Sequence, residues 1–587
     1  MTFLETATRA IQRLVLTTAT LILLSSCTAQ RSTSSDVFTL SIVGTNDVHG
    51  QMLPAGDRGG LVTISAYVDA LRAARADDEG AVLLIDAGDM WQGTLESNLV
   101  EGAAVVKAYN AMGFAAATIG NHEFDFGPIG SKAIPRKPDD DPRGALKQRA
   151  SEAAFPLLAA NLVDETSGRP VEWDNVRPSI VVEVKGIKVG VVGVVTERAL
   201  QATISANTVG LQIAPLVETI TREARVLRDQ GASIIVVAAH AGSRCKAFDD
   251  PMDVSSCNMG GEIMRVAATL PTGLVDHIIA GHVHQGIAHI VNQISITSSY
   301  SNTRAFSRVD LDVDRSTGRV VSRHVHPPTR ACLSIVRSSG DCALPDTDPL
   351  ITTKAVYEGR EIVPNEAVLE IAMKAAAVAA STKEEKLGVY LESAFEIPTS
   401  AESALGNLMT DALLESIDAD VAIHNVMGGI RNGLPEADLT FGAVYEMFPF
   451  DNRVVVLELT GRQLREIIAE QARRDRRRAG FSGMRVLVSC DDNGMDVVME
   501  RTNGTAIRDA DRVRVIANDY LALGGDDVFS PILPDGGFDF DDTMPRTRDV
   551  LLQWFRNRTN ALDPVDFMTT DRPKWNLPDS MPESCTL

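Results

Sequence analysis

The sequence predicts an α/β protein with two layered domains joined by a helix, and three patterns support this fold class. Between residues 37 and 300, short β-rich runs alternate with helical stretches, as in layered α/β domains. A second pattern of this kind runs from 392 to about 555. Residues 365–384 lie between the two and are rich in alanine with apolar periodicity, which predicts a long helix. At roughly 150 residues per domain, a chain of 587 residues is expected to form two to four domains.

The chain begins with a segment typical of an export signal. Arg9 and Arg13 precede an apolar run of about 11 residues, and small residues then lead to Cys27. The segment resembles a bacterial lipoprotein signal, in which Cys27 becomes the lipidated first residue. A short membrane helix is the alternative, but a span requires roughly 20 apolar residues. We therefore expect a signal peptide over 1–26 and a tether over 27–36.

Export would place the remaining cysteines in an oxidising compartment, where disulfides form. Proximity along the chain favours two short pairs and leaves a third: Cys245–Cys257, Cys332–Cys342 and Cys490–Cys585. Six cysteines permit fifteen pairings, so other connectivities stay open. A thiolate zinc site is a further alternative, although no CxxC spacing supports it.

The charge balance limits the classes of partner. The chain has 56 basic and 78 acidic residues, which gives a formal net charge of −22. This balance argues against nucleic-acid binding, which favours a basic face. It does not exclude small anionic substrates, because bound metal ions reverse the local field.

Metal-ligating side chains follow five predicted strands of the first half. They come, in chain order, after residues 38–43 (Asp47 and His49), 81–85 (Asp86 and Asp89), 115–119 (Asn121, His122 and Asp125), 233–239 (His240) and 277–280 (His282 and His284). Ligands of α/β domains gather beyond the carboxyl ends of strands, so we expect these side chains to converge. Mixed imidazole and carboxylate ligands suit Mn²⁺, Zn²⁺ or Fe, and a carboxylate can bridge two such ions. The pattern therefore predicts a two-metal centre able to polarise a phosphoryl oxygen.

A further HxH motif stands apart from this series. His324-Val325-His326 precedes two prolines and follows no strand-plus-glycine signal. We interpret it as solvated, and residues 327–350, rich in Pro, Ser, Cys and Asp, as a loop.

The ordered motifs D-x-H, G-D, G-N-H-E, H-A-G and G-H-x-H resemble those of the calcineurin-like metallophosphoesterases. The extended motif at 120–127, together with a second domain, resembles the bacterial 5′-nucleotidase and UDP-sugar hydrolase family, over about 38–550. The resemblance implies a four-layer β-sandwich flanked by helices over 37–345, a loop and linker helix over 346–388, a C-terminal α/β substrate-binding domain over 389–560 and a tail over 561–587.

The resemblance also implies roles for the residues at the strand ends. It assigns Asp47, His49 and His284 to one metal, Asn121, His240 and His282 to the second, and Asp89 to a bridging position. His122 matches a catalytic histidine that contacts the phosphoryl group, and Asp125 matches the carboxylate that orients it. A cationic imidazole can stabilise developing negative charge or protonate a leaving oxygen. The implied cofactors are two divalent metal ions, Mn, Zn or similar.

The second domain supplies the residues that the resemblance assigns to substrate binding. Arg431 in Gly-Gly-Ile-Arg matches a phosphate-reading arginine, and Phe450 and Tyr520 match two aromatic side chains that enclose a base. Asp526 matches a carboxylate that contacts ribose hydroxyls. Core packing is the alternative for the two aromatic residues.

Three departures from the family pattern affect this substrate clamp. Val426 and Met427 separate Asn425 from the glycine pair, and no arginine precedes the Leu-Gly-Asn-Leu motif at 405–408. Asp527 replaces the last glycine of Gly-Gly-Asp-Gly. The departures weaken the prediction of a nucleoside 5′-monophosphate in particular.

The resemblance implies an enzyme of nucleotide catabolism, a phosphoester hydrolase that releases phosphate by attack of metal-bound hydroxide, as 5′-nucleotidases do. A 2′,3′-cyclic-nucleotide phosphodiesterase with 3′-nucleotidase activity and a UDP-sugar hydrolase are alternatives, and so is a nucleotide-binding lipoprotein without turnover. We expect a small nucleotide as partner, no nucleic acid, and attachment through Cys27 to the periplasmic side of the outer membrane. Metal identity, physiological substrate and oligomeric state stay open.

Overall fold

The computed structural model describes residues 36–587, except for 131–132, 345–346, 475–478, 492–493, 535–536, 542–543, 569–573, 579–584 and 586–587. The predicted signal peptide, Cys27 and nearly all of the tether lie outside the described residues. None of the described helices is both long enough and apolar enough to cross a membrane.

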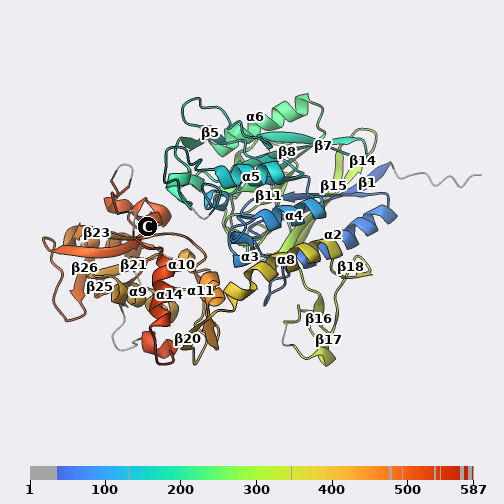
Figure 1. The fold of residues 1–587 in the computed structure, drawn as a ribbon. Helices are drawn as coiled ribbons and strands as arrows, with labels where there is room; N and C mark the ends of the chain where they lie inside the picture. The colour runs from blue at the N-terminus through green and yellow to red at the C-terminus, as the bar shows by residue number, and fades with distance from the viewer. Residues whose placement is uncertain are drawn as a thin grey trace, which may run out of the picture.

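The first half of the chain contains two stacked β-sheets (Figure 1). The larger sheet consists, in spatial order, of β15 (Val320–Arg330), β14 (Ala305–Asp314), β1 (Val37–Thr45), β2 (Ala81–Asp86), β3 (Ala116–Thr118), β4 (Leu157–Leu158) and β6 (Val176–Arg177). The smaller consists of β12 (Gly286–Val291), β13 (Ile294–Ser299), β11 (His277–Ala280), β10 (Ile234–His240), β8 (Ile187–Val195) and β7 (Ser179–Val184). A short separate pair is formed by β5 (Leu162–Asp164) and β9 (Leu211–Ile213).

Apolar clusters lie between the sheets and on both outer faces. Leu40, Leu83 and Val191 belong to one cluster shared by the two sheets. Strands buried on both faces need near-continuous apolar runs, such as the Val-rich β8. Helices cover the larger sheet on its outer face, namely α2 (Gly60–Asp77), α4 (Ala103–Met112) and α5 (Gly144–Glu152), with α3 (Leu95–Asn98) beside α4. The smaller sheet is covered by α6 (Leu216–Asp229) and α7 (Glu262–Thr269). The predicted four-layer sandwich flanked by helices is therefore confirmed.

The predicted linker helix is α8 (Glu366–Lys383), drawn in yellow in Figure 1. It begins where the side chain of Asn365 accepts hydrogen bonds from the amides of Ala367 and Val368, as a good N-cap does. It packs against α4, α3 and α2 of the first half and leads into the second half. Before it stand short strands, β16 (Ser334–Val336), β17 (Thr352–Lys354), β18 (Val356–Tyr357) and β19 (Arg360–Glu361).

The second half is a smaller α/β unit. Its central sheet has the order β23 (Val454–Thr460), β27 (Arg512–Asn518), β21 (Val421–His424) and β24 (Gly480–Ser482). Two further sheets are β26 (Gly494–Arg501) with β25 (Met484–Asp491) and β28 (Trp575–Asn576), and β20 (Lys386–Tyr390) with β22 (Asp438–Thr440). The helices are α9 (Ala404–Ser416), α10 (Val426–Gly429), α11 (Phe441–Met447), α12 (Gly461–Arg473), α13 (Asp519–Ala522) and α14 (Thr547–Arg556).

One local prediction is wrong. His324 and His326 lie within β15, which continues through Pro327 and Pro328 to Arg330. Because β15 is the edge strand of its sheet, prolines that donate no hydrogen bond are tolerated there. His326 is also partnered, since its Nε2 lies 3.0 Å from Asp310 Oδ2. The region predicted as a loop thus begins as a strand, although His324 itself is exposed, as expected.

The three expected disulfides are present: Cys245–Cys257, Cys332–Cys342 and Cys490–Cys585. The last joins residues 95 positions apart and ties the C-terminal tail to β25. Strand β28 of the tail also pairs with β25, so the tail is an integral part of the second half.

Candidate active site

The seven predicted metal ligands converge at the carboxyl ends of strands from both sheets. They form two groups, each with ligand atoms within 4.8 Å of one another: Asp47, His49 and His284, and Asp89, His240 and His282. Asn121 Oδ1 joins the second group, 3.0 Å from His240 Nε2 and 3.0 Å from His282 Nδ1. Asp89 Oδ2 lies 3.1 Å from His240 Nε2 and 4.0 Å from His49 Nε2, so it faces both groups. That is the position a bridging carboxylate requires.

The backbone at this centre is strained. Five of the seven residues have positive φ: Asp47 (49°), His49 (50°), Asp89 (57°), His282 (74°) and His284 (60°). Such conformations cost on the order of 1–3 kcal/mol each and persist only where the surrounding structure enforces them. They let consecutive turns aim several side chains at one point. Gly120 serves the same end, since a Cβ there would lie 2.3 Å from Asp89 Oδ1.

Backbone carbonyls orient the ligands from behind. His49 Nδ1 lies 2.9 Å from Gln92 O, and His240 Nδ1 lies 2.8 Å from Ala87 O. A ring nitrogen that faces a carbonyl carries the hydrogen, so each Nε2 lone pair points into the site. The amide of Asn121 is oriented in the same way, because its Nδ2 donates to Ala202 O at 2.8 Å.

The charge states of these groups suit divalent cations. Burial alone would raise the pKa of Asp47, but His284 and His240 outweigh it and hold the pKa at about 2. Burial likewise opposes ionisation of Asp89, and nearby His240 and His122 bring its pKa well below the usual range. Burial lowers the pKa of His282 to about 3, which keeps that imidazole neutral. Burial alone would lower the pKa of His240, but Asp89 outweighs it and raises the pKa to about 10, so this imidazole is protonated in the metal-free site and would lose its proton as an ion binds. Ionised carboxylates and neutral imidazoles are the donors that Mn²⁺, Zn²⁺ or Fe prefer, so the residues fit two such ions once His240 is deprotonated.

His122 stands beside the centre rather than in it. Its Nδ1 lies 2.7 Å from Asp125 Oδ2, and Asp125 Oδ1 accepts a hydrogen bond from Thr203 Oγ1 at 2.7 Å. Burial alone would lower the pKa of His122, but Asp125 and Asp89 outweigh it and raise the pKa above its usual value. Because Asp125 holds Nδ1, the other ring nitrogen faces the cavity described below.

Sequence reasoning left Glu123 of the same motif without a role. Its carboxylate accepts hydrogen bonds from the amides of Gly120 (2.6 Å), Asp89 (2.9 Å) and Met90 (2.7 Å). It thereby joins the turns that follow β2 and β3, and burial raises its pKa to about 8. In the sequence, only its position between His122 and Asp125 indicated that Glu123 could have a role in the site. Asp86, which the strand-end pattern placed with the candidate ligands, supports its loop instead by accepting hydrogen bonds from Thr45, Gly88 and Tyr109.

A cavity of about 1120 Å³ lies between the two halves of the molecule. Its wall includes Asp89, Asn121 and His122 from the first half, and all four predicted substrate residues of the second: Arg431, Phe450, Tyr520 and Asp526. Arg431 Nη2 lies 3.1 Å from His122 Nε2, and the guanidinium stands 5.2 Å from the centroid of the Phe450 ring. The structure thus places the residues predicted to bind a phosphate and those predicted to bind a base around one cavity.

Three arginines that the sequence motifs did not reveal also line this cavity: Arg198, Arg546 and Arg548. Arg548 pairs with Asp451, donates to Phe450 O at 2.9 Å and lies 4.3 Å from the Tyr445 ring centroid. It therefore fixes the loop that carries Phe450. No local motif marks these arginines, because they reach the cavity only through the tertiary fold.

Asn425 also lines the cavity despite the two residues that separate it from the glycine pair. Its Nδ2 donates to Asp526 Oδ2 at 2.7 Å, while its Oδ1 is buried without a hydrogen-bond partner. The displaced asparagine is thus in the site, and it orients Asp526.

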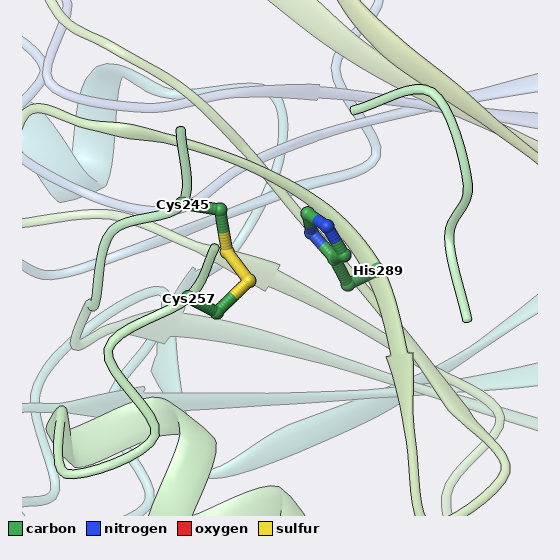
Figure 2. A group of neighbouring side chains, drawn as sticks. All are labelled: Cys245, Cys257 and His289. Atoms are coloured by element: carbon green, nitrogen blue, oxygen red, sulfur yellow. A yellow bond between two sulfur atoms is a disulfide. The ribbon is translucent and has the colours of Figure 1, made fainter. Parts of the chain in front are cut away.

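Another cluster of metal-ligating residue types consists of Cys245, Cys257 and His289 (Figure 2). Its two sulfur atoms form a disulfide, and the His289 ring lies beside them in the interior. Without a thiolate, the oxidised cluster offers only one good ligand. The two groups at the cavity are therefore the metal site that we consider further.

Comparison with known families agrees with this geometry. Residues 40–286 match the family described as calcineurin-like phosphoesterase, and residues 378–533 match the 5′-nucleotidase C-terminal domain. The first match contains all seven predicted ligands, and the second contains the four predicted substrate residues.

Individual relatives are distant. The chain is 26% identical to a cell wall protein of Listeria monocytogenes over 84% of this chain and 64% of that one. It is 25% identical to an endonuclease of Bacillus subtilis and spans only 38% of its length. It is 24% identical to a 5′-nucleotidase of Vibrio cholerae, covering 85% of this chain and 87% of that one. A solved 5′-nucleotidase precursor from Thermus thermophilus shares the fold, with a TM-score of 0.70, 21% identity, and coverage of 93% of this chain and 100% of that chain.

Proposed function

Because this chain belongs to the calcineurin-like phosphoesterases that carry a 5′-nucleotidase C-terminal domain, we propose that it hydrolyses nucleotide phosphoesters with two divalent metal ions. One observation carries the proposal. His122 and members of both ligand groups (Asp89, Asn121, His282 and His284) border the same cavity as an arginine, two aromatic rings and a carboxylate of the second domain. A nucleotide offers a chemical partner for each of these features.

The phosphoryl end of the substrate would lie between Arg431 and the ligand groups. Two divalent ions held there would supply Lewis acidity toward a phosphoryl oxygen and lower the pKa of a bound water. Arg431 presents a planar fork that suits phosphate, and its Nη2 lies 3.1 Å from His122 Nε2. That contact leaves no room for a phosphate, so the Arg431 side chain would move away from the ring before both residues could donate hydrogen bonds to one phosphate.

His122 is placed to protonate the leaving oxygen as its bond to phosphorus breaks. Asp125 holds Nδ1 and favours the cationic ring, which leaves the Nε2 proton directed at the cavity. Asp89 assists in placing the backbone, since its Oδ1 accepts a hydrogen bond from the His122 amide at 2.9 Å.

The nucleoside end would lie against the second domain. Phe450 and Tyr520 would stack on the base, an interaction that tolerates different bases. Asp526, oriented by Asn425, would accept hydrogen bonds from sugar hydroxyls. We take a nucleoside 5′-monophosphate as the first candidate substrate.

A nucleoside diphosphate ester, such as a UDP-sugar, is the second candidate. A volume of about 1120 Å³ is at the upper end for a small-molecule site. Arg546 adds a guanidinium to the wall beyond Arg431, which suits a substrate with a second phosphate.

A phosphate-release panel on metal-reconstituted protein tests the proposal. It should compare AMP, UDP-glucose, 3′-AMP and 2′,3′-cyclic AMP, because the last two represent the phosphodiesterase alternative. We expect phosphate release from AMP, or cleavage of UDP-glucose to UMP and glucose 1-phosphate measured by product analysis, and little reaction of the others. With two metals bound, no product from any of the four would overturn the proposal and leave a nucleotide-binding protein without turnover.

We also propose that the protein is exported and anchored to the periplasmic side of the outer membrane through a lipid on Cys27. The basic, apolar and small-residue pattern before Cys27 supports this, and so do the three disulfides. Incorporation of labelled palmitate into the wild type but not into Cys27→Ser is the expected result. Equal labelling of both proteins would refute the anchor.

A further inference from the structure

We propose that Arg198 and Asp527 are positioning residues, which align the two domains across the cavity through the segment 196–204. The proposal rests on the proposed function, since it concerns how the phosphate end and the nucleoside end of one substrate are kept in register. Neither residue is one of the seven predicted metal ligands or of the four predicted substrate residues, although both line the cavity.

Segment 196–204 holds three residues of the first domain's site. The Thr196 amide donates to His240 O at 2.9 Å, and Ala202 O accepts from Asn121 Nδ2 at 2.8 Å. Thr203 Oγ1 donates to Asp125 Oδ1 at 2.7 Å. A shift of this segment would therefore reach a metal ligand and the carboxylate that orients His122.

The same segment reaches the second domain through an ion pair. Arg198 Nη1 lies 2.7 Å from Asp527 Oδ2, and both residues line the cavity. Asp527 directly follows Asp526, which is bonded to Asn425. The ion pair thus connects the segment behind His122 with the loop that would bind the sugar.

Asp527 is one of the departures from the family pattern, where a glycine is expected. Its φ of 55° is a conformation that glycine adopts without strain and that aspartate adopts at some cost. The side chains of Arg198 and Asp527 are 74% and 35% exposed, and exposed pairs contribute little to stability. An aspartate here costs backbone strain and stabilises the fold little, so its contribution lies in orientation across the cavity.

Asp527→Gly gives the sharpest test, because orientation and fold stability should then change in opposite directions. Glycine relieves the strain at φ 55°, so the melting temperature should stay equal or rise. Loss of the carboxylate should lower kcat/KM by about three- to fivefold at low salt. A variant with unchanged kcat/KM would overturn the proposal.

Charge exchange tests the pair itself. Arg198→Glu should lower kcat/KM by about fivefold, and adding Asp527→Lys should restore it to within about twofold. High salt should shrink the difference between wild type and Arg198→Glu, because exposed charges are screened. If the double variant is folded by circular dichroism yet remains as impaired as Arg198→Glu, the pairing is refuted.

The matched control is the pair Lys386–Asp438, which has the same 2.7 Å separation and exposed side chains but joins β20 to β22 within the second domain. Lys386→Glu should leave kcat/KM unchanged. A loss equal to that of Arg198→Glu would show a general charge effect and overturn the proposal.

Small-angle X-ray scattering gives a readout without turnover. Arg198→Glu should increase the radius of gyration, and the double exchange should reverse the increase. An unchanged radius in Arg198→Glu counts against the pair even if the enzyme proves inactive on every substrate. Failure of the proposed function and failure of this proposal are therefore distinguishable.

Discussion

The two walls of the cavity are built on different principles. On the first domain's side, five of the seven predicted ligands are buried at strand ends, and only His282 and His284 are half-buried. Five of the seven sit in strained turns braced by backbone carbonyls and by Glu123. On the second domain's side, Arg431, Phe450, Tyr520 and Asp526 lie on short helices and loops and are partly exposed. Rigid geometry serves chemistry that tolerates little displacement, whereas a looser wall can accept different substrates. Four substitutions test this contrast.

Asp89→Ala should have the largest effect. Removing a carboxylate that faces both ligand groups should release metal and lower kcat by more than about 10³-fold, because metal charge stabilisation is worth several kcal/mol. Elemental analysis and phosphate release measure the two losses. His324→Ala, on the exposed edge strand, is the control and should retain both metals. Two ions still bound to Asp89→Ala would contradict the bridging position.

His122→Ala should lower kcat by about 10²- to 10⁴-fold while metal content is retained, since a general acid contributes on that scale. Steady-state kinetics and elemental analysis on the same preparation measure both quantities. Unchanged turnover would remove His122 from the reaction. Loss of metal from His122→Ala would instead indicate that His122 is a metal ligand.

Phe450→Leu should act on substrate binding alone. Stacking on a base is worth roughly 1–3 kcal/mol, so KM should rise about five- to 100-fold for nucleotides. A small artificial phosphoester without a base serves as the control substrate, and its turnover should not change. An equal loss on both substrates would show that Phe450 supports the fold instead of binding the base.

Thr203→Val should have the smallest effect, because it removes one hydrogen bond behind the catalytic pair. The loss of about 1 kcal/mol corresponds to roughly a fivefold decrease in kcat, with KM unchanged. Thr203→Ser keeps the hydroxyl and should behave as the wild type. A serine variant as impaired as valine would assign the effect to packing.

The same contrast explains what the sequence could predict. Each metal ligand follows a β-rich run within a few residues, because the chemistry needs a specific side chain at a turn, and such signals are local. The linker helix was also predictable from its alanine-rich pattern and apolar periodicity. Glu123 accepts hydrogen bonds from backbone amides, which have no sequence signature of their own. Its place in the motif was a signal that it matters, but its role emerged only from the fold.

Arg198 and Arg548 were missed for another reason. Arg198 meets a residue 329 positions away, and Arg548 meets one 97 positions away. No spacing rule connects such pairs. The prediction that a loop begins at Pro327 was wrong because β15 is an edge strand. An edge strand accommodates prolines, which would end a strand inside the sheet.

The division of the cavity between two independently cored domains has a consequence for how such a protein can diverge. Each domain has apolar clusters of its own, so changes in one wall need not disturb the folding of the other. On the proposed assignment, replacements around residues 425–452 or 520–548 would alter which molecule is accepted while the hydrolytic apparatus stays intact. New specificities could then arise by gradual drift through active intermediates, with no need to rebuild catalysis at each step.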